Sequence, residues 1–455
     1  MPHTKASITI CGAGILGVSV AYFLAVRHGL KDILLVDERA PLTLTSDKST
    51  ECYRNWWPGP GDAMLRLMNR SIDLLEEFAG LSGNSFHLNQ RGYLYLTSDP
   101  ASVVELRASA EEASALGAGE LRIHDKLNSA YIPHQPEGYA NSPRGADLLL
   151  DRSHIQSEFP YLSQDTVAAL HVRRAGWLSA QQYGAWLLDQ ARAADVRFLS
   201  GRVTAVETTA GAVSQVHLAD GSQISTPIFV NAAGPHLAAV GELLGAAIPV
   251  YNELHLKASF DDHLGIVPRH APLLICADPQ QLPWTDEERA FLAGDPGTAW
   301  LLETLPSGAH TRPEGGDKAS SVLVLWDLHD AAVEPIFPLP EDPMYTELAL
   351  RGLSRILPGM RAYSEKIPRP FVDGGYYTKT RENRPLSGPL PASGAYLIGG
   401  ASGYGIMASA ALAELLAAHI TGVALPTYAP AFSLARYEDP AYQGLLENWG
   451  DSWQL

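Results

Sequence analysis

The sequence predicts an α/β protein in which a Rossmann-type dinucleotide-binding domain is interleaved with a second, α+β domain. Three observations support this expectation. A glycine-rich turn joins a strand to a helix near the N-terminus, and a second glycine loop precedes a long apolar helix near the C-terminus. Between them, from about Val250 to Pro370, lie proline-rich loops and isolated strands. A chain of 455 residues is also too long for one hydrophobic core.

The first unit has the order of a dinucleotide-binding βαβ motif. The strand "ASITIC" leads into Gly12-x-Gly14-x-x-Gly17, a helix follows to about His28, and the strand "DILLVDE" carries Asp37, 25 residues after Gly12. Gly12 makes the tight turn, Gly14 lets the backbone approach a pyrophosphate, and Gly17 lets the helix pack on the strand. Asp37 can accept hydrogen bonds from a ribose diol.

The uncharged stretch 6–26 could also be a signal anchor. Its central glycines and the β-branched residues before them favour a buried strand, a turn and a helix instead. The other alternative to a dinucleotide-binding unit is that the three glycines form a glycine-rich turn by chance.

The elements that follow are predicted from periodicity. They are an amphipathic helix from about Asp62 to Gly80, a strand in "RGYLYLTSD", a helix in "ASVVELRASAEEASALG", a helix then a strand in "GWLSAQQYGAWLLDQARAADVRFL", two or three strands in 201–234 with a hairpin turn at Asp220-Gly221, and a strand in "SVLVLWDLH".

Composition excludes some partners. The net charge is -17 and the pI is near 5.3, whereas nucleic acids and anionic membranes bind basic surfaces. The three cysteines are far apart and the fifteen histidines form no metal-binding spacing. We therefore expect no metal site, no membrane span and a cytoplasmic, reducing location.

The segment "ECYRNWWPGPG" (51–61) places Arg54 among Tyr53, Trp56 and Trp57, just before a Pro-Gly run that prevents regular structure. Arg54 is either a clamp for an anionic ligand or a structural arginine paired with an acid such as Glu51.

Four segments together resemble the D-amino acid oxidase superfamily, most closely its sarcosine oxidase-like and glycine oxidase-like branch. They are "ITICGAGILGVSVAYFLA" with "LLVDE", "GWLSAQQYGAWLLDQARAADVRF", "IFVNAAGPH", and "GYYTKTRENRPLSGP" followed by "YLIGGASGYGIM". The resemblance spans nearly the whole chain. It implies a discontinuous FAD-binding domain (1–85, 150–248 and 366–455) and a substrate domain (86–149 and 249–365) built on a mostly antiparallel sheet.

The resemblance also implies the cofactor contacts. FAD would be bound by two glycine loops and the segments beside them: Gly12, Gly14, Ile15, Leu16, Gly17, Asp37, Glu38, Thr45, Ser46, Val203, Gly400, Tyr404, Gly405, Ile406 and Met407. A helix that starts near Gly405 would point its positive end at the flavin edge where negative charge collects on reduction. The loop "GGASGYG" lacks the G-x-S-x-G spacing of a hydrolase nucleophile at Ser402.

Arg54 aligns with the arginine that holds the substrate carboxylate in the sarcosine oxidase-like branch, and a guanidinium suits a carboxylate because it forms two parallel bonds. Two departures matter: Met407 replaces a second cation and Glu51 replaces a flavin-contacting arginine. Tyr404 replaces a histidine that the family often has in its glycine loop. Lys257 could supply the missing positive charge near the flavin, or it is a surface lysine.

The expected function is oxidation of a C–N bond in an amine, an amino acid or N-alkyl amino acid, by hydride transfer to flavin N5, giving an imine that water hydrolyses. The alternatives are a dehydrogenase with a non-oxygen electron acceptor, a FAD-binding assembly or interaction factor, and an NAD-dependent dehydrogenase. The FAD is expected to be non-covalent, because Gly375 stands where sarcosine oxidases have the attaching cysteine and no histidine lies between Asp37 and Phe86. Cys52 is the nearby thiol.

Overall fold

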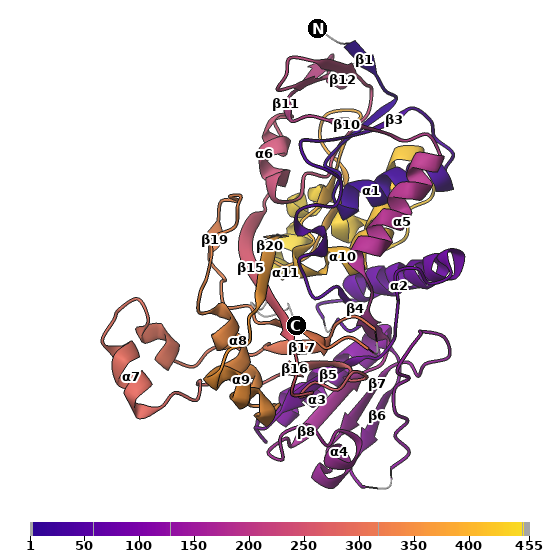
Figure 1. The fold of residues 1–455 in the computed structure, drawn as a ribbon. Coiled ribbons are helices and arrows are strands. Elements are labelled where there is room, and N and C mark those ends of the chain that lie inside the picture. The colour runs from indigo at the N-terminus through magenta and orange to yellow at the C-terminus, as the bar shows by residue number, and fades with distance from the viewer. Residues whose placement is uncertain (1–2, 58, 128, 317, 448, 450–455) are drawn as a thin grey trace.

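The computed structural model describes residues 3–57, 59–127, 129–316, 318–447 and 449. A six-stranded, mostly parallel sheet with its helices lies at one end of the molecule, and a large, mostly antiparallel sheet lies at the other (Figure 1). This architecture confirms the predicted fold class.

The glycine-rich N-terminal unit begins the six-stranded sheet. In spatial order the strands are β10 (Arg197–Ser200), β3 (Ile33–Asp37), β2 (Ile8–Cys11), β14 (Phe229–Asn231), β22 (Ala395–Gly399) and β21 (Leu386–Pro389). All pairs are parallel except β21 with β22. All four residues of β2 are buried, as expected for a strand covered on both faces.

Helices α1 (Ile15–Tyr22), α5 (Ala180–Ala193), α10 (Gly405–Thr421) and α2 (Ala63–Ser82) pack on one another beside this sheet. Helix α1 continues as a π-helical turn to Arg27, close to its predicted end. The prediction that α2 ends at Gly80 is wrong, because the left-handed cap is Gly83, with φ of 65°. The strand, turn and helix predicted over 6–26 are confirmed.

The segment 402–421, which includes α10, is long and apolar enough to cross a membrane by length and composition. In the structure 72% of this window is buried inside the protein, against α1, α2 and the sheet.

A four-stranded sheet, β1 (His3–Lys5), β13 (Gln223–Ser225), β12 (Ala212–Leu218) and β11 (Val203–Thr209), adjoins the first. The predicted hairpin turn at Asp220-Gly221 is confirmed: the Gly221 N–H donates to the carbonyl of Leu218, and Gly221 has a φ of 83°.

The large sheet has ten strands. Nine follow one path, β19 (Ala332–Val333), β15 (Tyr251–Asp261), β18 (Ser321–Leu325), β17 (His310–Pro313), β16 (Leu273–Cys276), β5 (Tyr93–Thr97), β8 (Ala168–Val172), β7 (Ala146–Leu149) and β6 (Leu121–His124). The tenth, β20 (Phe371–Lys379), pairs with β15 from Tyr251↔Lys379 to Ser259↔Phe371, and these two strands lead from one part of the molecule to the other (Figure 1). Strands β8 and β20 belong to the large sheet but fall inside ranges predicted for the FAD-binding domain. The chain therefore crosses between the two sheets more often than those ranges imply. The division into domains stays a prediction.

The remaining helices are α3 (Ser102–Ala113), α4 (Arg152–Glu158), α6 (Leu237–Glu242), α7 (Asp286–Ala293), α8 (Tyr345–Leu353), α9 (Arg361–Glu365) and α11 (Pro440–Glu447). Helix α7 projects away from the large sheet (Figure 1) and begins with a capping box between Thr285 and Glu288. A two-stranded pair, β4 (Cys52–Arg54) with β9 (Ala175–Trp177), lies between the two main parts.

Candidate active site and cofactor cavity

A cavity of about 530 Å³ opens where the parallel strands of the six-stranded sheet end. Its wall includes Gly12 after β2, Asp37 at the end of β3, Ala232 after β14 and Gly400 after β22. The carboxyl ends of parallel strands are the usual binding edge of such sheets, because the loops that leave them meet there.

The start of α1 forms one wall of the cavity. An α-helix leaves its first N–H groups without intrahelical partners, so they attract anions. The Ile15 N–H donates to Ser46 Oγ at 2.9 Å, and Gly14, Ile15 and Leu16 all line the cavity. A Cβ added to Gly14 would lie 3.2 Å from Ser46 Oγ, so a larger side chain would fill the space between this loop and Ser46.

Gly17 has a packing role. A Cβ there would lie 1.9 Å from the Gly12 carbonyl oxygen, so only glycine lets α1 approach the turn. Gly17 itself does not line the cavity.

Asp37 lies at the end of the cavity that Glu38 and Val203 also line. Its Oδ2 accepts a hydrogen bond from Ala13 N at 2.8 Å and its Oδ1 accepts one from Arg39 N at 2.9 Å. Each carboxylate oxygen can accept a further bond, so Asp37 is oriented by the backbone and still able to bind a hydroxyl donor.

The second glycine loop closes the opposite side. Gly400 has a φ of 63°, where a side chain would be strained, and Ser402 adopts a φ of 46°. Gly405 and Ile406, the first residues of α10, line the cavity. Met407 and Tyr404 are buried behind them and are not in the cavity wall.

Two hydroxyls test whether a polar cofactor suits this space. Thr45 Oγ1 and Ser402 Oγ are buried at the cavity wall and have no hydrogen-bond partner within the described part of the chain. Leaving such groups unsatisfied costs about 1–3 kcal/mol each, so a ligand with polar atoms beside them stabilises the protein. Together with the free end of α1, these groups fit a dinucleotide.

Of the predicted cofactor residues, twelve line the cavity: Gly12, Gly14, Ile15, Leu16, Asp37, Glu38, Thr45, Ser46, Val203, Gly400, Gly405 and Ile406. The sequence interpretation missed Arg39, His236, Tyr376 and Tyr377, which also line it. The last two lie in the segment "GYYTKT" on β20, where Gly374 to Thr378 are all buried.

Arg54 lies outside this cavity, at the end of β4, and is 5% exposed. Its guanidinium carbon is 4.6 Å from the ring centroid of Trp57 and 5.7 Å from that of Tyr93, while its Nε donates to the Trp56 carbonyl at 3.2 Å. The Trp57 ring is therefore the aromatic group that covers the Arg54 guanidinium. Pro58, the start of the Pro-Gly run, is outside the described residues.

Glu51 is not the structural partner of Arg54 that the sequence suggested. Its Oε2 lies 3.7 Å from Nη2 of Arg312, a second buried arginine that also pairs with Glu314. Burial raises the pKa of Glu51, and the neighbouring charges of Arg312 and Lys257 oppose that effect.

Tyr404 packs edge-on against Trp57, with ring centroids 4.9 Å apart. Its hydroxyl donates to the Asn383 carbonyl, and burial raises its pKa. Tyr404 therefore supports the aromatic wall around Arg54 rather than the cofactor cavity.

Lys257 lies on β15, and its Nζ donates to the Ser49 carbonyl at 3.2 Å. Ser49 lines the cofactor cavity, so Lys257 is a half-buried residue directly behind that wall rather than a surface lysine.

A buried charged cluster lies beside the cavity and was missed from the sequence. His255 Nδ1 is 2.6 Å from Asp327 Oδ1 and its Nε2 is 3.1 Å from Glu253 Oε2, which Lys379 also contacts at 2.9 Å. The His255 ring stacks on Tyr377 at 3.9 Å. Burial alone would lower the pKa of His255, but Asp327 and Glu253 raise it to about 9, so the imidazole is charged at neutral pH. Alternation along β15 puts Glu253 and His255 on one face, which is the signal the sequence offered.

Among the described residues, no group of three or more His, Cys, Asp or Glu side chains is placed to hold a metal ion. The three cysteines are free thiols.

Comparison with known proteins identifies relatives. Solved structures similar to this one include L-proline dehydrogenase from P. horikoshii (TM-score 0.72, 18% identity, covering 96% of this chain and 99% of that one). Others are glycine oxidase from Geobacillus kaustophilus (TM-score 0.71, 14% identity, 95% and 99% covered) and iminodiacetate oxidase from Chelativorans sp. (TM-score 0.69, 18% identity, 94% and 98% covered). At these identities the similarity shows the fold.

A curated relative is the mitochondrial pyruvate dehydrogenase phosphatase regulatory subunit of Mus musculus, 28% identical over 239 residues. The match covers 50% of this chain and 23% of that protein. The family described as FAD dependent oxidoreductase matches residues 7–419. FAD is therefore the dinucleotide that the cavity fits, and the chain belongs to the FAD dependent oxidoreductase family.

Proposed function

We propose that the protein oxidises the C–N bond of an amine that carries a carboxylate, either an amino acid or an N-alkyl amino acid. The observation that carries the proposal is Arg54, a buried guanidinium lodged between aromatic rings at the junction of the two main parts of the molecule. Three similar structures are of proteins named glycine oxidase, iminodiacetate oxidase and L-proline dehydrogenase, names that share a carboxylate-bearing amine.

When bound, FAD supplies the two-electron chemistry, and the protein supplies binding and orientation. Arg54 would bind the substrate carboxylate in a bidentate pair. Trp57, Tyr93 and Tyr404 exclude water around that pair, which strengthens it because the local dielectric is low. Holding the carboxylate at one fixed point orients the amine end of the substrate relative to the cofactor cavity.

Two other functions remain candidates, each favoured by a named relative. The similarity to a proline dehydrogenase favours an electron acceptor other than oxygen, and the match to a phosphatase regulatory subunit favours a FAD-binding regulatory protein. We expect a small-molecule substrate. We also propose a cytoplasmic location, because the three widely spaced cysteines suit a reducing compartment.

The test is flavin bleaching under nitrogen with a panel of amino acids and N-methyl amino acids, followed by peroxide measurement in air. Bleaching by an amino acid supports the proposal, and peroxide release then separates an oxidase from a dehydrogenase. If no amine bleaches the flavin, the regulatory candidate replaces the enzyme.

Arg54→Ala provides the residue-level test. The variant should lose about a hundredfold or more in kcat/KM, as expected for a charge-assisted bidentate contact of about 3 kcal/mol, while its FAD content stays unchanged. Wild-type kinetics, or loss of the flavin itself, would return Arg54 to a structural role.

A further inference from the structure

Tyr95 lies on the face of the large sheet that looks toward the FAD-binding part. Successive side chains of a strand alternate between faces, so Tyr93 and Tyr95 of β5 share one face while Leu94 and Leu96 point to the other. Tyr93 and Tyr95 belong to the same apolar cluster as Trp57, and their ring centroids are 6.3 Å apart. Tyr95 is therefore the next ring along from the wall of Arg54.

The hydroxyl of Tyr95 is buried and has no hydrogen-bond partner among the residues that the structure describes. The residue is only 7% exposed, so water does not compensate from the surface. Other buried tyrosines nearby are satisfied: Tyr53 donates to the Asn89 carbonyl at 2.7 Å. A buried hydroxyl without a partner destabilises the folded protein, and a ligand atom that accepts its hydrogen bond would offset that cost.

Tyr93 links Arg54 to Tyr95: its ring centroid is 5.7 Å from the Arg54 guanidinium carbon and 6.3 Å from the Tyr95 ring centroid. Burial raises the pKa of Tyr95 and Arg54 is the first influence that opposes it. Tyr95 is thus a neutral hydrogen-bond donor in the field of a buried cation. An anion placed beside Arg54 would pair with the guanidinium and also accept a hydrogen bond from the Tyr95 hydroxyl.

We propose that Tyr95 is a specificity-determining residue that donates its hydroxyl proton, as a hydrogen bond, to the substrate carboxylate held by Arg54. This inference rests on the proposed function and names the second donor of its carboxylate site. Met407, which the resemblance aligns with a second cation of the related oxidases, is buried and uncharged here. A site made of one cation and one neutral hydroxyl favours a substrate with a single carboxylate, because the two groups supply no second positive charge for another.

The experiment measures binding to the holoenzyme rather than turnover. The probe is (methylthio)acetate, in which sulfur replaces the reactive amine, and its matched neutral probe is ethyl methyl sulfide, which lacks the carboxylate. Binding is followed by perturbation of the flavin absorption spectrum. The variant is Tyr95→Phe, which removes only the hydroxyl.

Tyr95→Phe should weaken binding of (methylthio)acetate about tenfold or more and leave the weak binding of the neutral probe unchanged. In an Arg54→Ala background the same change should have a much smaller effect, because both groups act on one carboxylate. Without a probe the melting temperature of Tyr95→Phe should equal or exceed that of the wild type, since no hydrogen bond is lost.

Tyr363→Phe is the matched control. Its hydroxyl is satisfied, accepting from Leu264 N at 2.9 Å and donating to Asp262 at 2.7 Å, on the opposite face of the sheet. This variant should melt at a lower temperature and bind the probe normally.

Equal probe affinity in Tyr95→Phe and the wild type would overturn the inference, as would a fall in melting temperature without a change in affinity. Failure of the proposed function gives a different result, because a protein that oxidises no amine can still bind the carboxylate probe through both residues.

Discussion

At the residue scale, the cysteines bear on whether FAD is attached covalently. Cys11 lines the cavity, and burial raises its pKa to about 12, so it remains a protonated and unreactive thiol at neutral pH. Cys52 is buried too, and its Sγ donates to the Thr50 carbonyl at 3.2 Å. Gly375 has no side chain, and a Cβ there would already lie 3.2 Å from Thr45.

We therefore expect acid precipitation to release all of the yellow colour into the supernatant. Cys11→Ser and Cys52→Ser should release it equally. A pellet that stays yellow, or a flavin-bearing peptide after proteolysis, would show that attachment is covalent.

We expect cofactor affinity to depend on Gly14, which lines the cavity at the start of α1. In Gly14→Val the branched side chain would occupy the gap between this loop and Ser46, where we expect the pyrophosphate to approach. The variant should purify colourless but folded, which is checked by its absorption spectrum and its circular dichroism. A yellow variant with normal FAD content would contradict the assignment of this loop.

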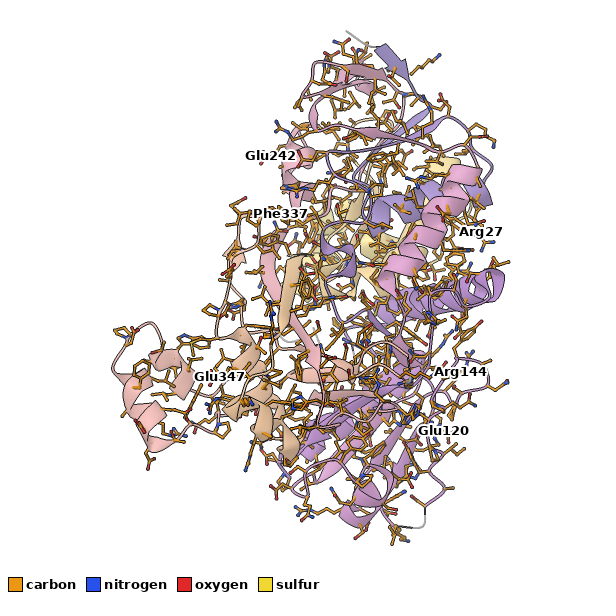
Figure 2. The ribbon with its side chains drawn as sticks, in the orientation of Figure 1. Arg27, Glu120, Arg144, Glu242, Phe337 and Glu347 are labelled. Atoms are coloured by element: carbon orange, nitrogen blue, oxygen red, sulfur yellow. The ribbon has the colours of Figure 1, made fainter. Side chains whose placement is uncertain are left out.

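At the element scale, the segment after β19 packs against the outside of the cavity wall. Phe337 lies on this segment near α6, the helix that carries Glu242 (Figure 2). Its ring is 4.9 Å from the Arg39 guanidinium carbon, 5.5 Å from the Tyr376 ring and 6.5 Å from the His236 ring. All three partners line the cavity, so Phe337 contacts three parts of the cavity wall from outside.

Phe337→Ala should raise the dissociation constant of FAD about tenfold, because it removes one cation–π contact and two aromatic pairs of about 0.5–1.5 kcal/mol each. Fluorescence titration of the apoprotein with FAD measures this change. Ile336→Ala is the matched control, since this neighbouring side chain is 57% exposed, and it should bind FAD normally. Equal affinity in the two variants would remove the segment from cofactor retention.

The elements that sequence reasoning found best are those with a repeating pattern. The strand, turn and helix over 6–26, the hairpin at Asp220-Gly221 and the strand of "RGYLYLTSD" follow from local spacing. The end of α2 did not, because the sequence offers both Gly80 and Gly83 as stops and only the backbone of the folded chain shows that Gly83 adopts the left-handed cap. The cofactor loops were found through their glycines, which encode backbone geometry.

The residues that were missed gain their roles from distant parts of the chain. Asp327 meets His255 across 72 residues, and Glu51 meets Arg312 instead of its near neighbour Arg54. Tyr95 was part of a predicted strand, but nothing local shows that its hydroxyl lacks a partner. Such contacts depend on strand order in the large sheet, which the sequence alone did not predict.

At the scale of the whole molecule, the charged cluster of His255, Asp327, Glu253 and Lys379 couples stability to pH. The pKa of His255 is about 9 in the folded protein, above its ordinary value near 6.5. Its stabilising contribution is therefore complete below about pH 6.5 and is lost as the pH rises through 9. The groups that face it are the two carboxylates and the Tyr377 ring.

The free energy of unfolding should accordingly fall between pH 6.5 and 9.5, which urea titrations at several pH values would measure. His255→Gln should lower stability at pH 6.5 and flatten this dependence. A His255→Gln variant with the same pH profile as the wild type would place the titrating group elsewhere.

The interleaving of the two sheets also has a consequence for synthesis on the ribosome. Strand β14 acquires its neighbour β22 from residues 395–399, and β15 acquires β20 from residues 371–379, so neither sheet is complete until most of the chain has emerged. Pairings this distant in sequence form slowly, because the chain must close large loops first. Nascent chains should therefore expose unpaired, apolar strands for most of translation and depend on chaperones until the last strands arrive.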